Sequence, residues 1–371
     1  MFARGLVACA LAAALAAPVR AQTREITLAE ALRRAAELNP DIRTAEAELA
    51  AARGGLRGAR LFTYNPEISV GVGRVGFGDT SLVGFDFALS QRFELGGKRG
   101  ARIRGAESRS AAAEARLARR RQEVAARVYQ AFVLALIARL RAETAREAEQ
   151  VTADAQRAAS ERLALGGGTL LEVNVAAAAV SRDRRVRLEA ERSHASAVIE
   201  LARAIGLPPE ETAEPAGAPE LPAPDARAES TLVALAVERR ADLRAAAAER
   251  AAAEADVRFA RGLAWPDPAV GALVGRDDVR RWQLTLSVPI PLLNRGQGAQ
   301  AQARAELERA RIAEGALRRQ VEFEVRDAYQ AYMRAREAQA AFERGGVERL
   351  AQNLQLAQES FRAGKINFLV F

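Results

Sequence analysis

The sequence predicts a mainly helical protein with a small β part, organised as two tandem repeats of helix, β-hairpin and long helix. Residues 28–173 and 232–371 pass through the same signals in the same order, at an offset of roughly 200 residues. Within each repeat the apolar periodicity changes from helical to alternating and back to helical. The corresponding segments are 41–43 and 242–244, 66–68 and 268–270, 85–90 and 282–287, 129–131 and 329–331, and 166–173 and 364–371.

The first 21 residues have the features of a secretory signal peptide. Arg4 precedes an apolar stretch over 5–17, and a small-residue motif ends at Ala21, so we expect cleavage between Ala21 and Gln22. Cys9 lies inside the apolar stretch with only eight residues before it, which is too few for a lipoprotein signal, so lipidation is not expected. Because this is the chain's one cysteine, the processed protein would have neither disulfides nor thiol chemistry.

Two β-hairpins are expected, from strands at 67–73 and 85–90 in the first repeat and at 269–275 and 282–288 in the second. The second strand of each hairpin alternates apolar with small or polar residues, which gives it one apolar face. We expect that face to contact lipid through Phe85, Phe87, Leu89, Trp282, Leu284, Leu286 and Val288.

Four strands leave two open edges, and each unpaired backbone group in lipid costs several kcal/mol. Covering the sheet with a large core is a weak option, because the chain is 49% hydrophobic but only 5% aromatic, and much of the apolar content is alanine. We therefore expect identical chains to complete a closed barrel, for which strands of about ten residues are long enough. No later run reaches the roughly 20 apolar residues of a membrane-spanning helix.

Helices are predicted over 28–61, 99–165 and 169–205. The longest would measure on the order of 100 Å, and the other two together nearly match it. Gly166, Gly167 and Gly168 interrupt the helical pattern, and Thr169 can cap the next helix, so a helical hairpin turns here. The helices alone are also compatible with a coiled coil on a solvated stalk.

Six prolines between residues 206 and 225 predict an extended connector that cannot be helical. We place the first repeat at 22–205, this connector at 206–225 and the second repeat at 226–371.

The residue inventory argues against catalysis and tight ligand binding. His194 is the one histidine and lies in a charged helical stretch, where a surface position is expected. Neither a metal-ligand cluster, a nucleophile with its base, nor a phosphate loop is present, so we expect no enzyme activity, no cofactor and no metal site. The formal net charge is +8, but arginines alternate with glutamate and alanine along helices, which disfavours nucleic-acid binding.

Two further segments, at corresponding positions after the second strand of each repeat, have the sequences FELGGKR (93–99) and VPIPLLNR (288–295). Together with the signal peptide and the duplicated unit, they resemble the TolC-type outer-membrane efflux proteins, also called outer membrane factors. The amino-acid sequence of the first segment is most similar to that of the heavy-metal efflux branch of this family, the CzcC and CusC relatives.

This resemblance implies a homotrimer in which three chains form a twelve-stranded barrel in the outer membrane of a Gram-negative bacterium. The helices would continue as an α-helical barrel through the periplasm. Such a protein is a passive exit duct for small substrates, served by a periplasmic adaptor (membrane fusion protein) and an inner-membrane pump of the resistance-nodulation-division (RND) type.

The resemblance also assigns roles to the two hairpin tips. The family's tips meet the adaptor, and the matching residues here are Leu165, Gly166, Gly167, Gly168, Thr169, Leu170, Gly364, Lys365, Ile366 and Asn367. The family's duct closes near this level, and polar residues at the matching positions are Glu172, Asn174, Arg362 and Lys365.

The second repeat departs from the family pattern, because the sequence stops at Phe371 in the middle of its tip motif. We expect a truncated or interrupted product, and a barrel that closes a tunnel poorly. An alternative function is that of a periplasmic coiled-coil structural or adaptor protein without a membrane barrel.

Overall fold

The computed structural model describes residues 22–77, 80–217, 226–277 and 279–343, together with 352–353, 355–357 and 359–360. The chain forms two compact units. Unit 1 comprises Met1–Arg43, Arg121–Ala226 and Gln330–Phe371, and unit 2 comprises Thr44–Arg120 and Arg227–Tyr329. Outside the described residues lie the signal peptide with Ala21, part of the connector (218–225), and the second-repeat positions Arg362, Gly364, Lys365, Ile366 and Asn367.

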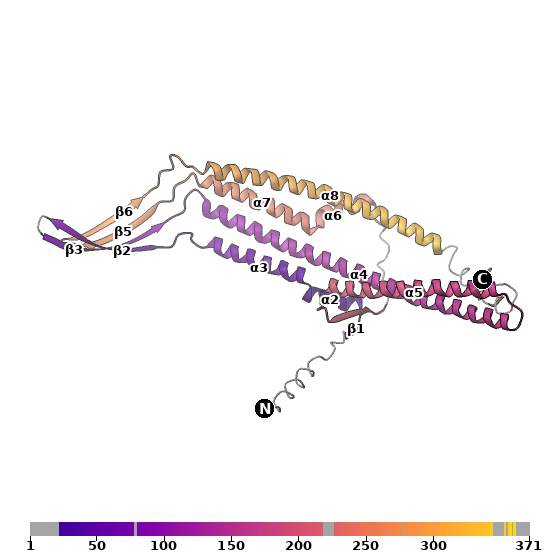
Figure 1. The fold of residues 1–371 in the computed structure, drawn as a ribbon. Helices are drawn as coiled ribbons and strands as arrows, with labels where there is room; N and C mark the ends of the chain where they lie inside the picture. The colour runs from indigo at the N-terminus through magenta and orange to yellow at the C-terminus, as the bar shows by residue number, and fades with distance from the viewer. Residues whose placement is uncertain are drawn as a thin grey trace, which may run out of the picture. The chain divides into compact units, whose positions relative to one another are not determined.

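Unit 2 contains a four-stranded antiparallel sheet in the order β2-β3-β5-β6 (Figure 1). The predicted hairpins are both present, as β2 (Glu67–Phe77) with β3 (Thr80–Arg92) and β5 (Ala269–Arg276) with β6 (Arg280–Ser287). Strands β3 and β5 pair in register, with Phe87 opposite Val274, so one sheet joins the two repeats. Strands β2 and β6 each pair with a single strand and form its edges.

Each strand connects to one helix: β2 to α3 (Pro40–Arg60), β3 to α4 (Lys98–Ala164), β5 to α7 (Ala241–Gly262) and β6 to α8 (Gln297–Glu343). The parts of these helices that belong to unit 2 lie in the same order as the strands (Figure 1). A shorter helix, α6 (Glu229–Arg239), precedes α7. The buried positions of α4 and α7 are mostly alanine. Alanine favours the helix and lets neighbouring helix backbones approach closely.

Arg240 joins α6 to α7 and links them to α8. Its guanidinium lies 2.7 Å from the Asp242 carboxylate and 2.6 Å from that of Glu324. Hydrogen bonding to Asp242 raises the pKa of Arg240 despite partial burial, and the Glu324 contact adds to the shift. The two ion pairs of Arg240 therefore hold the start of α7 against α8.

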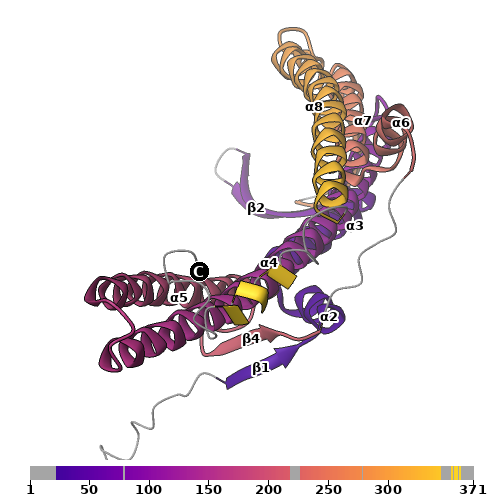
Figure 2. The same cartoon turned by 90° about the vertical axis from the view of Figure 1, so that its right-hand side faces the viewer.

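Unit 1 contains a helical hairpin and a small parallel strand pair (Figure 2). Part of α4 runs beside α5 (Leu170–Ile205), and β1 (Gln22–Ile26) pairs with β4 (Glu211–Pro215) near α2 (Leu28–Leu38). The strand pair was not predicted, since β4 lies in the proline-rich stretch 206–225. Burial of Ile26 and Ala213 explains why so short a pair is ordered here.

The prediction of one helix over 28–61 is wrong in one respect, because the chain breaks between α2 and α3 at Asn39. The buried Asn39 side chain donates a hydrogen bond to the Ala204 carbonyl at 2.8 Å and accepts one from the Asp41 N–H at 2.9 Å. Pro40 then begins α3, a position where its missing N–H costs nothing. Pro40, which disfavours a helical conformation at Asn39, and the contact of Asn39 with α5 together explain the break.

Gly206 ends α5 in the left-handed region, with φ of +88°. Its N–H donates to the Ala202 carbonyl at 3.0 Å, which caps the helix. A Cβ at this position would lie 2.8 Å from the Asn39 Cα, so the turn permits glycine only. Gly217 has a similar φ of +77°, but a Cβ there would meet nothing within 4 Å.

We therefore predict that Gly206→Ala destabilises the protein more than Gly217→Ala. Gly217→Ala is the control and should lower the free energy of unfolding by about 1 kcal/mol, because alanine is strained in the left-handed backbone conformation. Gly206→Ala should lower it by at least about twice as much, because the added methyl group also collides with the chain at Asn39. Thermal unfolding followed by circular dichroism measures both. Equal midpoints for the two variants would contradict the packing described for Gly206.

Candidate functional site

One face of the unit 2 sheet is apolar across all four strands. Val70, Phe87, Val274 and Trp282 are register partners in neighbouring strands, so their side chains point to the same side. The rows on either side add Ile68, Val72, Phe85, Leu89, Val270, Leu284 and Leu286. Each of these side chains is between 46% and 78% exposed. The register thus brings six of the seven residues predicted to contact lipid onto one continuous face.

Val288, the seventh, lies one residue beyond β6 and is also exposed. The apolar alternation continues past it through Ile290 and Leu292, which are exposed as well. A contiguous apolar surface of this extent is unusual on a soluble monomer and indicates contact with lipid or protein.

The opposite face of the sheet carries mostly small and polar side chains, with Leu273 as an apolar exception. Here Arg281 of β6 donates a hydrogen bond to Asp86 of β3 at 2.9 Å, across the intervening strand β5. The position between them is Gly275, where any Cβ would collide with the Asp86 carboxylate. This ion pair was not predicted from the sequence, because it depends on the register between the two repeats. The glycine at a polar position of β5 is the one local signal that could have suggested it.

A buried ion pair lies where the sheet meets the helices. Lys98, at the start of α4, is 4% exposed, and its Nζ lies 2.6 Å from the Asp267 carboxylate and 3.0 Å from the Trp265 carbonyl. Asp267 also accepts hydrogen bonds from the Leu95 N–H at 3.0 Å and the Tyr64 hydroxyl at 3.1 Å. This cluster, named here the Lys98–Asp267 joint, ties the first repeat to the second.

The FELGGKR segment makes the turn from β3 into α4. Gly96 has φ of +71°, and a Cβ on it would lie 2.7 Å from the Trp265 Cβ. Glu94 forms an ion pair of 2.5 Å with Arg102 on the first turns of α4. Glu94, Gly96, Gly97 and Lys98 therefore all help to fix the turn from β3 into α4.

The joint shifts two pKa values. Burial raises the pKa of the Asp267 carboxyl, but the hydrogen bonds from Lys98 and from the Leu95 N–H outweigh burial and hold it below the ordinary value. Burial, followed by the hydrogen bond to Asp267, raises the pKa of Tyr64. Asp267 is thus stabilised in its charged form, with Tyr64 kept as a hydrogen-bond donor.

The first helical hairpin tip lies between α4 and α5. Gly166 has φ of +78°, and the Gly167 N–H donates to the Arg162 carbonyl at 2.9 Å, so the glycines end α4. Thr169 caps α5: its hydroxyl accepts from the Glu172 N–H at 3.2 Å, and its own N–H donates to the Glu172 carboxylate at 3.3 Å. Glu172, predicted as a gate residue, is thus engaged in this capping box.

Apolar side chains project from this tip. Leu165 is 87% exposed, and Leu170 and Leu171 are also exposed. Asn174, one turn further along α5, is exposed too. The tip therefore presents a rigid turn with three leucines to its surroundings.

Ion pairs hold α4 against α5 behind the tip. Glu149 pairs with Arg187 and lies 3.0 Å from Arg184, while Glu191 lies 2.8 Å from both Arg146 and Arg187. Hydrogen bonds from Arg187 and then Arg184 lower the pKa of Glu149, and one from Arg146 lowers that of Glu191 despite some desolvation. These partly exposed pairs set the alignment of the two helices more than they add stability.

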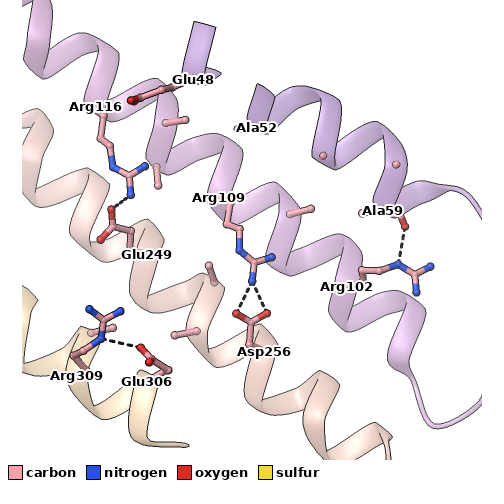
Figure 3. Close-up of a pocket in the computed structure, with 18 of the residues that line it drawn as sticks. Glu48, Ala52, Ala59, Arg102, Arg109, Arg116, Glu249, Asp256, Glu306 and Arg309 are labelled. Carbon is pink, nitrogen blue, oxygen red and sulfur yellow. Dashed lines mark hydrogen bonds and ion pairs between the residues drawn. The ribbon is translucent and has the colours of Figure 1, made fainter. Parts of the chain in front are cut away.

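A hollow of about 1290 Å³ lies against α3, α4, α7 and α8 in unit 2 (Figure 3). Arg109 and Arg116 lie two turns apart on α4 and pair with Asp256 and Glu249 on α7, the first pair at 2.7 Å. Arginines and acidic residues line the hollow in equal number, separated by alanines and glycines. The hollow therefore has charged walls without a net charge.

Within the described ranges, no three histidine, cysteine, aspartate or glutamate side chains converge in a way that could hold a metal ion. Among the same residues, no helix is both long enough and apolar enough to cross a membrane.

Comparison with known proteins gives a family match. A family profile described as outer membrane efflux protein matches residues 31–207 and 232–370. The cobalt-zinc-cadmium resistance protein CzcC of Cupriavidus metallidurans is 30% identical over 279 residues, which cover 72% of this chain and 63% of that protein. The chain thus spans less than two thirds of the length of this curated relative.

Two solved structures are similar along most of the chain. A membrane protein from Pseudomonas aeruginosa aligns with a TM-score of 0.76 at 21% identity, covering 92% of this chain and 85% of that one. The outer-membrane channel OprN aligns with a TM-score of 0.73 at 21% identity, covering 92% and 82%. These likenesses concern the fold, and they confirm the predicted mainly helical architecture with a small antiparallel sheet.

We predict that Asp267→Asn destabilises the protein by about 2–4 kcal/mol at pH 7, because it leaves the buried Lys98 ammonium without its counter-charge. Since the folded-state pKa of Asp267 is lowered, its stabilisation is present above the ordinary carboxyl pKa of about 3.9 and is lost as the pH falls through the folded-state value. The difference in thermal midpoint between the wild type and the variant should therefore be constant above the ordinary carboxyl pKa and should shrink as the pH is lowered below it.

The matched control is Asp256→Asn, which breaks the exposed pair with Arg109 and should change stability by less than about 1 kcal/mol at any pH. Midpoints of Asp267→Asn that follow those of the control at neutral pH would contradict a stabilising role for the joint.

Proposed function

Because the chain belongs to the outer membrane efflux protein family, we propose that it is the outer-membrane exit duct of a tripartite efflux system. The observation that carries this proposal is the exposed apolar face of a four-stranded sheet with two unpaired edges. If copies of the chain continue the sheet into a closed barrel, the backbone groups at its edges are hydrogen-bonded and its apolar face contacts lipid. Three chains with four strands each give a twelve-stranded barrel, the assembly proposed for this protein.

In this assembly the polar face of the sheet lines the interior of the barrel. The Asp86–Arg281 pair and the glycines beside it would then contact water, which suits charged groups better than lipid does. The helices of unit 2 would continue the wall into the periplasm. The duct is passive, and its energy comes from an inner-membrane pump of the RND type.

The first hairpin tip is the proposed contact with a periplasmic adaptor. Its exposed leucines and rigid capped turn support this role, since a preformed apolar contact loses little conformational entropy on binding. The second tip, at Gly364, Lys365, Ile366 and Asn367, is proposed for the same role by analogy. The proposed gate consists of Glu172, Asn174, Arg362 and Lys365, although the capping contact of Glu172 gives that residue a local task as well.

The cargo proposed is heavy-metal cations, on the strength of the likeness to the cobalt-zinc-cadmium resistance protein. The alternative function, a periplasmic coiled-coil structural or adaptor protein, would leave the apolar face of the sheet in water and is disfavoured for that reason.

Substitutions on the two faces of β3 test the proposal. Phe87→Arg places a charge in the middle of the face assigned to lipid, which should cost about 2–4 kcal/mol per chain and sharply reduce the protein recovered in detergent-extracted outer membrane. Ala88→Arg, one residue away on the opposite face, should be recovered like the wild type, because it would meet water. Immunoblots of fractionated cells measure both.

The proposal fails if the wild-type chain is released with the periplasm on osmotic shock. It fails equally if Phe87→Arg is recovered in the outer membrane as fully as Ala88→Arg, since the two faces would then be equivalent.

A further inference from the structure

Three arginines share the hairpin end of the apolar face. Arg276 and Arg280 are register partners on β5 and β6, and Arg276 is also opposite Phe85. Arg74 lies two residues from Val72 on β2, so its side chain points to the same side. We name Arg74, Arg276 and Arg280 the arginine cluster. All three residues are exposed.

The charges of this cluster are not balanced within the described part of the chain. Like charges directly opposite each other in a sheet are destabilising, and none of the three arginines forms an ion pair with any described residue. Two of the described acids nearby are directed elsewhere, as Asp86 and Asp277 both lie next to Arg281, at 2.9 Å and 3.5 Å. Among the described residues, the Arg276–Arg280 pair therefore has no counter-charge.

The surroundings of the cluster indicate what kind of anion it meets. Trp282 follows Arg280 by two residues on the same face, and aromatic side chains at the border of an apolar band are typical of a lipid interface. The apolar rows that begin beside the cluster offer a surface for acyl chains. A suitable ligand therefore has anionic groups at one end and several hydrocarbon chains at the other.

The spacing favours more than one anionic group. Arg74 is opposite Val83 and Arg276 is opposite Phe85 on the intervening strand β3, so the two arginines are two strands apart across the sheet and two residues apart along it, or about 12 Å. The planar guanidinium group of arginine donates two hydrogen bonds to the oxygens of a phosphate group, with a defined geometry. Two phosphates on a rigid sugar headgroup would fit such a pair of positions.

We propose that the arginine cluster binds the phosphate groups of lipid A, the bisphosphorylated glycolipid anchor of lipopolysaccharide, in the outer leaflet of the membrane. The inference rests on the proposed function, which directs the hairpins away from the periplasmic helices and so places this end of the apolar face in the outer leaflet. The acyl chains lie along Phe85, Phe87 and Trp282, while one phosphate meets Arg276 and Arg280 and the other meets Arg74.

The test uses the purified, detergent-solubilised oligomer and three lipids: bisphosphorylated lipid A, enzymatically dephosphorylated lipid A, and phosphatidylglycerol. Native mass spectrometry measures the binding of each. The double variant Arg276→Gln with Arg280→Gln should bind bisphosphorylated lipid A about tenfold or more weakly than the wild type, because several charge-assisted hydrogen bonds are lost. Dephosphorylated lipid A should bind both proteins alike and weakly.

Arg281→Gln is the matched control, because it removes an arginine from the next position of the same strand but from the opposite face. It should bind lipid A within about twofold of the wild type, since its side chain does not meet the lipid. If the double variant does not assemble, Arg276→Lys with Arg280→Lys keeps the charge without the bidentate fork and should bind with intermediate affinity.

Equal binding of bisphosphorylated lipid A by the wild type and the substituted oligomer would overturn the proposal. So would an equally tight, arginine-dependent binding of phosphatidylglycerol, because the cluster would then recognise any anionic lipid. If the wild-type chain inserts into membranes but lipid A binding is unaffected by the variants, this inference alone fails. If the wild-type chain does not insert, the proposed function fails together with it.

Discussion

The two unpaired edges of the four-stranded sheet constrain the rest of the molecule. Strands β2 and β6 each have one neighbour, and the face between them is apolar on all four strands, up to the arginines at its hairpin end. In water such a face would aggregate, and in lipid the open edges would leave backbone groups unpaired at several kcal/mol each. Both costs disappear when copies of the chain continue the sheet into a closed cylinder.

A closed cylinder also requires a firm connection between strands and helices, since each strand continues into one helix of the wall. The Lys98–Asp267 joint supplies that connection on one side, with Gly96 allowing the close approach of Trp265. Lys98 is buried because its charge is matched within 2.6 Å, and the joint links the two repeats at the point where one sheet already unites them. The two repeats therefore contribute strands to one sheet and are also linked where that sheet meets the helices of unit 2.

The periodic features could be predicted from the sequence, and the long-range contacts could not. Alternation at Phe85, Phe87 and Leu89 is a local signal, and the β-hairpins and the apolar face followed from it. The helical hairpin turn followed from another local signal, the glycines from Gly166 to Gly168 before Thr169. The hydrogen bond from Asn39 to Ala204 joins residues far apart in the sequence and could not be predicted, although Pro40 is a local signal for the helix break beside it. The Asp86–Arg281 pair likewise depends on the register of β3 with β5, which pairs strands from different repeats.

The number of chains in the detergent-solubilised particle tests the account most directly. Light scattering coupled to size-exclusion chromatography, corrected for bound detergent, should give three chains per particle, because three sets of β2, β3, β5 and β6 close the barrel proposed here. A single chain per particle that stays dispersed in buffer without detergent would contradict the account, since the sheet edges and the apolar face would then need no partner.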